Sequence, residues 1–168
     1  MAPRVRVDLT YCLALTALSE SLGALTGLTT MDLSGCKALV AVPASLGALT
    51  RLKTLNLATC CTLKALLALL GSLTALTSLN LGCCHAVMAL LALLGALTGL
   101  TSLDLELCSA LPESLGAFTG LMTLDLSGCK ALAAIPALLG SLTGLKTLNV
   151  ATCCTLKALL ALLGRSQR

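Results

Sequence analysis

Aromatic side chains are almost absent from this sequence. Tyr11 and Phe118 are the only two among 168 residues, and there is no Trp. Proteins that bind single-stranded nucleic acids stack the bases on aromatic rings and follow the phosphates with clustered basic residues. Here the net charge is only +4, and the basic residues are scattered along the chain. The sequence therefore predicts no nucleic-acid partner.

Charged side chains and histidine are also scarce. Charged residues make up 11% of the chain, with seven carboxylates and a single histidine. General acid–base catalysis draws mainly on these groups, and the chain contains no GxxxxGK[ST] phosphate-binding motif. We therefore expect no catalytic residues, no cofactor and no enzymatic activity.

Leucine and alanine dominate instead, with 48 and 25 occurrences and a mean hydropathy of +1.00. Residues 65–103 carry no formal charge, and 86–103 is long enough to cross a bilayer as a helix. However, Thr and Gly recur through this stretch, and it has neither an aromatic belt nor a Lys/Arg cluster beside it. We therefore do not expect membrane contact, and a membrane-associated helical protein is only an alternative interpretation.

The chain consists almost entirely of internal repeats. Residues 1–24 form a partial unit, and six further units begin at residues 25, 49, 73, 97, 118 and 142. Each unit has a single two-residue step between apolar residues, such as Met31 to Leu33, which is strand periodicity. The other steps of three and four suit turns and short helical pieces. Stacked units would bury their apolar edges and align these strands in one parallel sheet.

The apolar positions resemble those of leucine-rich repeats. The pattern LxxLxLxxCxxL occurs at Leu28–Leu39, Leu52–Leu63, Leu76–Val87, Leu100–Leu111, Leu121–Leu132 and Leu145–Leu156. The Cys-containing version, with LPESL at Leu111–Leu115, is most similar to the repeats of plant intracellular immune (disease-resistance) receptors. The resemblance implies an α/β solenoid, a right-handed superhelix with a concave parallel β-sheet and short helical or 3₁₀ return segments on the outer side. It implies a leucine-rich-repeat domain over 1–164, followed by a polar tail at 165–168.

Glycine occupies one position of every unit, at Gly23, Gly47, Gly71, Gly95, Gly116, Gly140 and Gly164. A positive-φ turn after the return segment would require glycine there. We expect this column to have that structural role.

The concave face is the expected partner-binding surface, and the resemblance implies a protein partner. Its candidate residues are Asp8, Tyr11, Asp32, Asn56, Asn80, Asp104, Glu106, Asp125 and Asn149. Asp104, Glu106 and Asp125 would form the most acidic spot, which could attract a basic partner.

Surplus leucines mark a second candidate surface on the outer side. They replace the Pro-x-Ser pattern of Pro43 and Ser45, and include Leu67, Leu69, Leu91, Leu93, Leu160 and Leu162. A stripe of exposed leucines could contact a partner. Self-association could occur through these leucines or through the ends of the solenoid, which lack a polar capping unit.

Seven of the ten cysteines occupy one inward position of the repeat, and Cys61, Cys83 and Cys154 are extra and expected to be exposed. Zinc sites usually need four ligands from two separated pairs. Cys83-Cys84-His85 cannot easily direct three ligands to one ion, since Cys84 should point inward, so no metal site is expected. So many free thiols fit a reducing compartment, and we expect the cytoplasm.

These features together predict a non-catalytic protein-interaction module in intracellular recognition or signalling. The resemblance implies a role in a defence response of the plant-receptor type. A truncated or unselected product of repeat expansion is the main alternative. It is favoured by the near-identity of Asp32–Gly71 and Asp125–Gly164, which indicates recent copying of a two-unit block.

Overall fold

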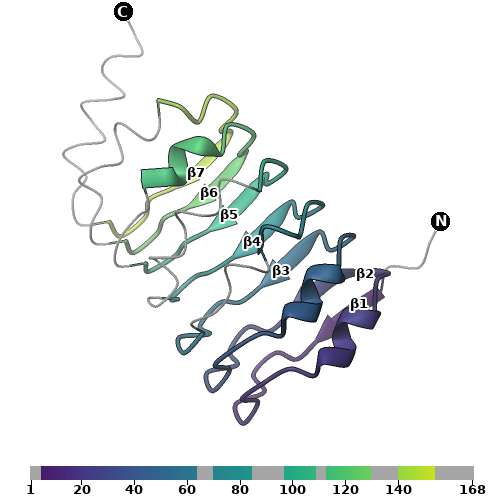
Figure 1. Cartoon of the computed structure of the whole chain (residues 1–168). Helices are drawn as coiled ribbons and strands as arrows, with labels where there is room; N and C mark the ends of the chain where they lie inside the picture. Colours follow the sequence, from purple (N-terminus) through teal and green to yellow (C-terminus); the bar gives the residue numbers. More distant parts are fainter. Residues whose placement is uncertain (1–4, 64–69, 85–96, 109–112, 130–139, 154–168) are drawn as a thin grey trace, which may run out of the picture.

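Seven short parallel strands form one continuous sheet in the computed structural model of the chain, in the order β1 to β7 (Figure 1). The structure describes residues 5–63, 70–84, 97–108, 113–129 and 140–153. The strands are β1 Val5–Asp8, β2 Leu28–Asp32, β3 Thr54–Asn56, β4 Ser78–Asn80, β5 Ser102–Asp104, β6 Thr123–Asp125 and β7 Thr147–Asn149. Three 3₁₀ helices lie between strands in the described residues, namely η1 Glu20–Ala24, η2 Ala44–Ala48 and η4 Glu113–Ala117. The chain is thus an α/β solenoid, as the sequence predicts.

The strand register follows the repeat. Equivalent residues of neighbouring units pair with each other, so Met31 lies beside Leu55, and Leu55 beside Leu79. The strands end one residue before the second apolar position of each unit. Asn56, for example, accepts the Ala58 N–H through its side-chain Oδ1, which turns the backbone directly after β3.

The core is a single apolar cluster that runs through the units from Leu18 to Cys153. In the described part of the chain every buried side chain is apolar or a cysteine. Leu28, Met31, Leu33 and Cys36 of the first complete unit are at most 1% exposed, as their inward positions predict. The repeat pattern also predicts an inward position for Leu25, and this is wrong, because its side chain is 41% exposed, whereas its equivalents Leu49 and Leu73 are at most 1% exposed.

The repeated glycine has a different role from the expected one. Gly23 and Gly47 lie inside η1 and η2, and the glycines with positive φ among the described residues are Gly35 and Gly128. A Cβ at Gly23 would collide with the backbone of Ser45, whose hydroxyl donates to the Glu20 carbonyl at 2.8 Å. At Gly23 glycine therefore allows close approach of the first two return segments, whereas at Gly71 of the same column an added Cβ would meet no atom within 4 Å.

Most of the stretch 86–103, which could form a spanning helix, lies outside the described residues, which begin again at Leu97. Strand β5 lies at the end of the uncharged stretch 65–103. Where the structure describes the chain, no helix combines the length and apolar character needed to cross a bilayer.

Candidate functional site

A row of Asp and Asn side chains runs across the concave sheet, one from each strand. These seven residues are called the Asx row here: Asp8, Asp32, Asn56, Asn80, Asp104, Asp125 and Asn149. In every unit the side-chain Oδ1 accepts the backbone N–H two residues later, at 2.8 to 3.1 Å. Each predicted binding residue of this row is therefore also the residue that turns its own strand out of the sheet.

The Asx row is also hydrogen-bonded between units. The Nδ2 of Asn56 donates to Asp32 at 3.2 Å, and that of Asn149 donates to Asp125 at 2.8 Å. In the middle of the sheet, the Nδ2 of Asn80 donates to Asp104 at 2.9 Å. These bonds fix the rotamers of both partners, so the row presents a preorganised polar surface.

The three carboxylates predicted to be strongest lie together. Asp104 and Asp125 are register partners on β5 and β6, and Glu106 follows Asp104 by two residues and is exposed. Burial raises the pKa of Asp104, and the neighbouring charge of Asp125 adds to this rise. Burial opposes ionisation of Asp125 as well, but hydrogen bonds from the hydroxyl and N–H of Ser127, and from Asn149, lower its pKa overall. The pKa values of the two carboxylates are thus shifted in opposite directions, although the two residues lie side by side on neighbouring strands.

Asp8 lies at the opposite end of the Asx row and is paired. Its carboxylate accepts hydrogen bonds from the hydroxyl and N–H of Thr10, which lower its pKa, and Arg6 contacts it at 2.6 Å. Among the described residues this is the one ion pair. No basic side chain that the structure describes forms an ion pair with Asp104, Glu106 or Asp125.

Tyr11 is 71% exposed, but it lies on the turn after β1 and not on a strand. Its ring covers Gly35 of the next unit, and a Cβ on Gly35 would collide with ring atoms. Leu107 covers Gly128 in the same manner, and is 46% exposed.

These four residues belong to a backbone feature that the sequence reasoning missed. One column of the repeat has positive φ in every described unit, namely Tyr11, Gly35, Thr59, Cys83, Leu107, Gly128 and Thr152. Where the next unit follows, the backbone N–H of the residue in this column donates to a carbonyl of that unit at 2.7 to 2.9 Å. Left-handed backbone costs about 1–2 kcal/mol for residues other than glycine, so the bonds between units hold a strained turn. Gly35 and Gly128 are the sequence signal that could have revealed the column.

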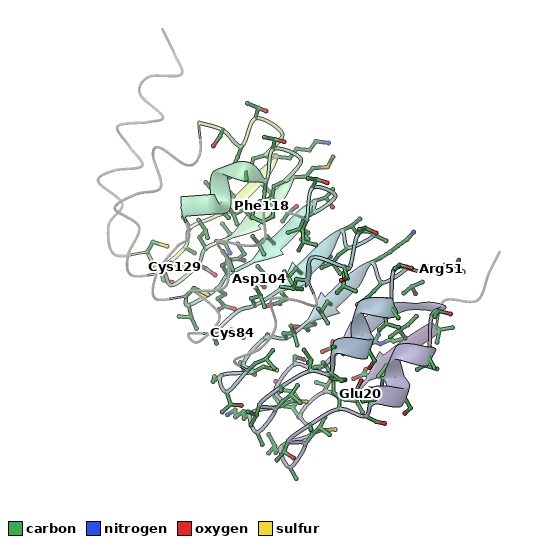
Figure 2. The ribbon with its side chains drawn as sticks, viewed as in Figure 1. Glu20, Arg51, Cys84, Asp104, Phe118 and Cys129 are labelled. Carbon is green, nitrogen blue, oxygen red and sulfur yellow. The ribbon has the colours of Figure 1, made fainter. Side chains whose placement is uncertain are left out.

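The inward cysteines form a second row, at the edge where the strands end. Figure 2 shows Cys84 and Cys129 at this edge and Arg51 at the opposite edge. Each thiol from Cys36 onward donates to the carbonyl of a leucine in the preceding unit, as Cys60 does to Leu33 at 3.1 Å and Cys84 does to Leu57 at 3.0 Å. Burial raises the pKa of Cys60 to about 12 and that of Cys84 to about 11. These thiols are structural.

The extra cysteines differ from this row. Cys61 is exposed and Cys83 is half-buried, while Cys154 and His85 lie outside the described residues. No group of three or more potential metal ligands occurs in the part of the chain that the structure describes. The outer leucines Leu67, Leu69, Leu91, Leu93, Leu160 and Leu162 also lie outside it, so self-association through them remains a prediction.

Comparison with known proteins finds similarity in structure alone. No family model matches the sequence, and no curated protein matches it either. The solved TLR13–ssRNA13 complex contains a chain with a TM-score of 0.63 and 24% identity over 88% of this chain. An internalin of Listeria monocytogenes has a TM-score of 0.55 and 18% identity over 80% of this chain. This chain spans 22% and 56% of those two proteins' lengths. At these identities the likeness establishes architecture, and the chain has the fold of leucine-rich-repeat solenoids.

Proposed function

We propose that this chain is a non-catalytic protein-interaction module whose concave face binds a basic segment of a partner protein. The observation that carries the proposal is the group formed by Asp104 and Asp125 on adjacent strands and by Glu106 in the turn after β5. We call these three residues the acidic group. It lies on a rigid sheet, and no basic side chain among the described residues pairs with it.

Rigidity supports binding because ordering a flexible surface costs free energy on association. Asp104 and Asp125 each accept one backbone N–H and one Asn side chain, so little rotamer freedom remains to be lost. Every carboxylate oxygen can accept more than one hydrogen bond. Both side chains therefore keep acceptor capacity for a partner while they hold their turns.

Charge supports the same conclusion. Fixed unpaired carboxylates steer the approach of a basic surface and repel an acidic one. The similar TLR13 chain was solved in complex with a single-stranded RNA. We do not propose RNA as a partner of this chain, because the acidic group would repel its phosphates. A lysine- or arginine-rich protein segment is the partner chemistry that fits.

A direct test uses a lysine-rich peptide as a probe and measures its affinity by fluorescence anisotropy at low and high salt. Glu106→Gln is the informative variant, because no described contact of its side chain holds the fold. Exposed ion pairs contribute about 1 kcal/mol or less, so we expect affinity to fall by up to about fivefold at low salt, with a smaller effect at high salt.

Asp8→Asn is the matched control. It removes a carboxylate from the same face, but the charge of this carboxylate is already neutralised by Arg6. We expect it to change affinity much less than Glu106→Gln. Equal effects of the two variants, or a glutamate-rich peptide bound as well as the lysine-rich one, would count against the acidic group as the site. An unselected product of repeat expansion would then be the better account.

The wider setting is also a proposal. The Cys-containing pattern and LPESL at Leu111–Leu115 support intracellular recognition or signalling of the plant defence-receptor type, in the cytoplasm. Cell fractionation followed by alkylation of free thiols tests this. The expected result is recovery in the soluble cytoplasmic fraction with the cysteines reduced, and recovery in an oxidising compartment would refute it.

A further inference from the structure

Two cysteines outside the inward row belong to neighbouring turns at the edge where the strands end, and the sulfur of one contacts the backbone of the other. Cys61 follows the inward Cys60 of one unit, and Cys83 precedes the inward Cys84 of the next. The Cys61 Sγ lies 3.4 Å from the carbonyl oxygen of Cys83 and 3.5 Å from that of Thr59. We propose that Cys61 and Cys83 form a dithiol modification site, which a peroxide oxidises to a disulfide between neighbouring units.

The distances set an upper limit on the separation of the two cysteines. A carbonyl oxygen lies about 2.4 Å from its own Cα by standard bond geometry, so the Cys61 Sγ is no more than about 6 Å from the Cys83 Cα. Rotation of the Cys83 side chain about its Cα–Cβ bond then decides whether the sulfurs meet. The charge that Cys61 would carry as a thiolate also contributes to the raised pKa of Cys83, after burial and Glu106, which is consistent with neighbouring thiols.

Backbone bonds hold this pair in place. Thr59 donates its N–H to the Gly82 carbonyl at 2.8 Å, and Cys83 donates its own to the Glu106 carbonyl at 2.8 Å. The turns that carry the two cysteines are therefore fixed to each other and to the following unit. A disulfide that closes by side-chain rotation would leave these bonds intact.

The adjacent inward thiols provide a contrast within the same turns. Cys60 and Cys84 are completely buried and donate to carbonyls of the preceding units. Complete burial shields them from a dissolved peroxide, whereas Cys61 is exposed and Cys83 is half-buried. Oxidation should therefore select Cys61 and Cys83 from the two adjacent Cys-Cys pairs.

The chemistry needs one oxidant, hydrogen peroxide. The Cys61 thiolate attacks a peroxide oxygen, the O–O bond breaks, and the products are a sulfenic acid on Cys61 and, after protonation of the leaving hydroxide, water. The Cys83 thiolate then attacks the Cys61 Sγ, the S–O bond breaks, and the hydroxide leaves as a second water with one proton. In total, two thiols and one peroxide give one disulfide and two waters, and an added dithiol reverses the bond by exchange.

The test treats the reduced native protein with a stoichiometric amount of hydrogen peroxide, alkylates the remaining thiols and locates them by fragmentation mass spectrometry. We expect a monomer that has lost two hydrogens, with Cys61 and Cys83 protected together and Cys60 and Cys84 still free. Dithiothreitol should restore alkylation of both sites.

Two variants separate this site from general oxidation. Cys61→Ser retains the size of an exposed side chain, and Cys83→Gly installs the residue that Gly35 and Gly128 supply at the same positive-φ position, so both variants should fold. In each, the remaining cysteine should accumulate sulfenic acid, which dimedone traps, with loss of the internal disulfide. Oxidation of Cys60 or Cys84 at the same rate would overturn the proposal. So would a disulfide-linked dimer of two chains as the main product, or unchanged loss of two hydrogens in both variants.

Discussion

The two copies of the duplicated block have nearly the same sequence and the same local hydrogen bonds, but they are buried differently. In both copies a serine hydroxyl and an asparagine amide bond the row aspartate, as Ser34 and Asn56 do to Asp32 and as Ser127 and Asn149 do to Asp125. In both, the inward cysteine donates at 3.1 Å to a leucine carbonyl of the preceding unit. Local geometry is therefore set within a unit and by its immediate neighbour.

Burial depends instead on position in the stack. Leu55 and Leu57 of the first copy are 3% and 0% exposed, whereas their equivalents, Leu148 on the last strand β7 and Val150 just after it, are only partly buried. In a solenoid each unit contacts only its neighbours, so identical residues stabilise the fold by different amounts.

Truncation of these leucines gives the largest expected difference between the copies. Leu55→Ala removes a fully packed side chain between β2 and β4 and should lower the free energy of unfolding by about 3 kcal/mol. Leu148→Ala removes a partly exposed one and should cost about 1 kcal/mol. Urea unfolding followed by circular dichroism measures both. Similar losses would mean that β7 is covered as completely as β3.

The two positive-φ glycines give the next largest effect. Alanine is strained in left-handed backbone by about 1–2 kcal/mol, and its Cβ would also collide with Tyr11 at Gly35 or with Leu107 at Gly128. A tyrosine ring must move as one rigid body, while a leucine can rotate its terminal methyl groups. We expect Gly35→Ala to cost about 2 kcal/mol and Gly128→Ala somewhat less, by thermal unfolding.

The covering side chains test this explanation. Combining Tyr11→Ala with Gly35→Ala removes the collision and leaves only the backbone strain. The double variant should therefore be more stable than the sum of the two single effects predicts. Simple additivity would show that the ring moves aside without cost.

The strands and their register follow from the sequence because one two-residue step recurs in every unit. Met31, Leu55 and Leu79 consequently pair across the sheet as expected. The column of glycines was assigned the wrong reason, since positive φ and close packing both select glycine and the sequence does not distinguish them. The positive-φ column was missed because residues such as Thr59 and Leu107 occupy it, and only the bonds between units explain why they are tolerated.

The candidate site was predictable as a set of neighbours but not as a set of roles. Equal spacing places Asp104 beside Asp125, as expected. The Asp-x-Ser pattern at Asp125 and Ser127 is typical of a side chain that accepts a hydrogen bond from the backbone two residues later. This pattern could have indicated that the acidic residues stabilise turns in addition to facing the solvent. Which asparagine donates to which aspartate depends on the whole row, and no single unit contains that information.

The smallest expected effect compares the two facing carboxylates themselves. The folded-state pKa of Asp125 is lowered, so its ionisation stabilises the fold at neutral pH, and this contribution is lost as the pH falls through that pKa. The pKa of Asp104 is raised, so its contribution is largest at low pH and is lost as the pH rises through its folded-state value. Asp125→Asn should therefore cost about 1 kcal/mol at neutral pH, where it loses charge-assisted hydrogen bonds on a partly exposed surface.

Asp104→Asn should cost less at neutral pH, because relief of repulsion from Asp125 offsets the lost bond from Asn80. Urea midpoints of both variants and the unaltered protein at about pH 7 and about pH 3 make the comparison, since Asp is largely protonated at the lower value in an unfolded chain. On acidification, the stability difference between Asp125→Asn and the unaltered protein should shrink. The stability of Asp104→Asn should instead fall further below that of the unaltered protein. Equal deficits at neutral pH would show that the hydrogen bonds of the Asx row, and not the charges, distinguish its members.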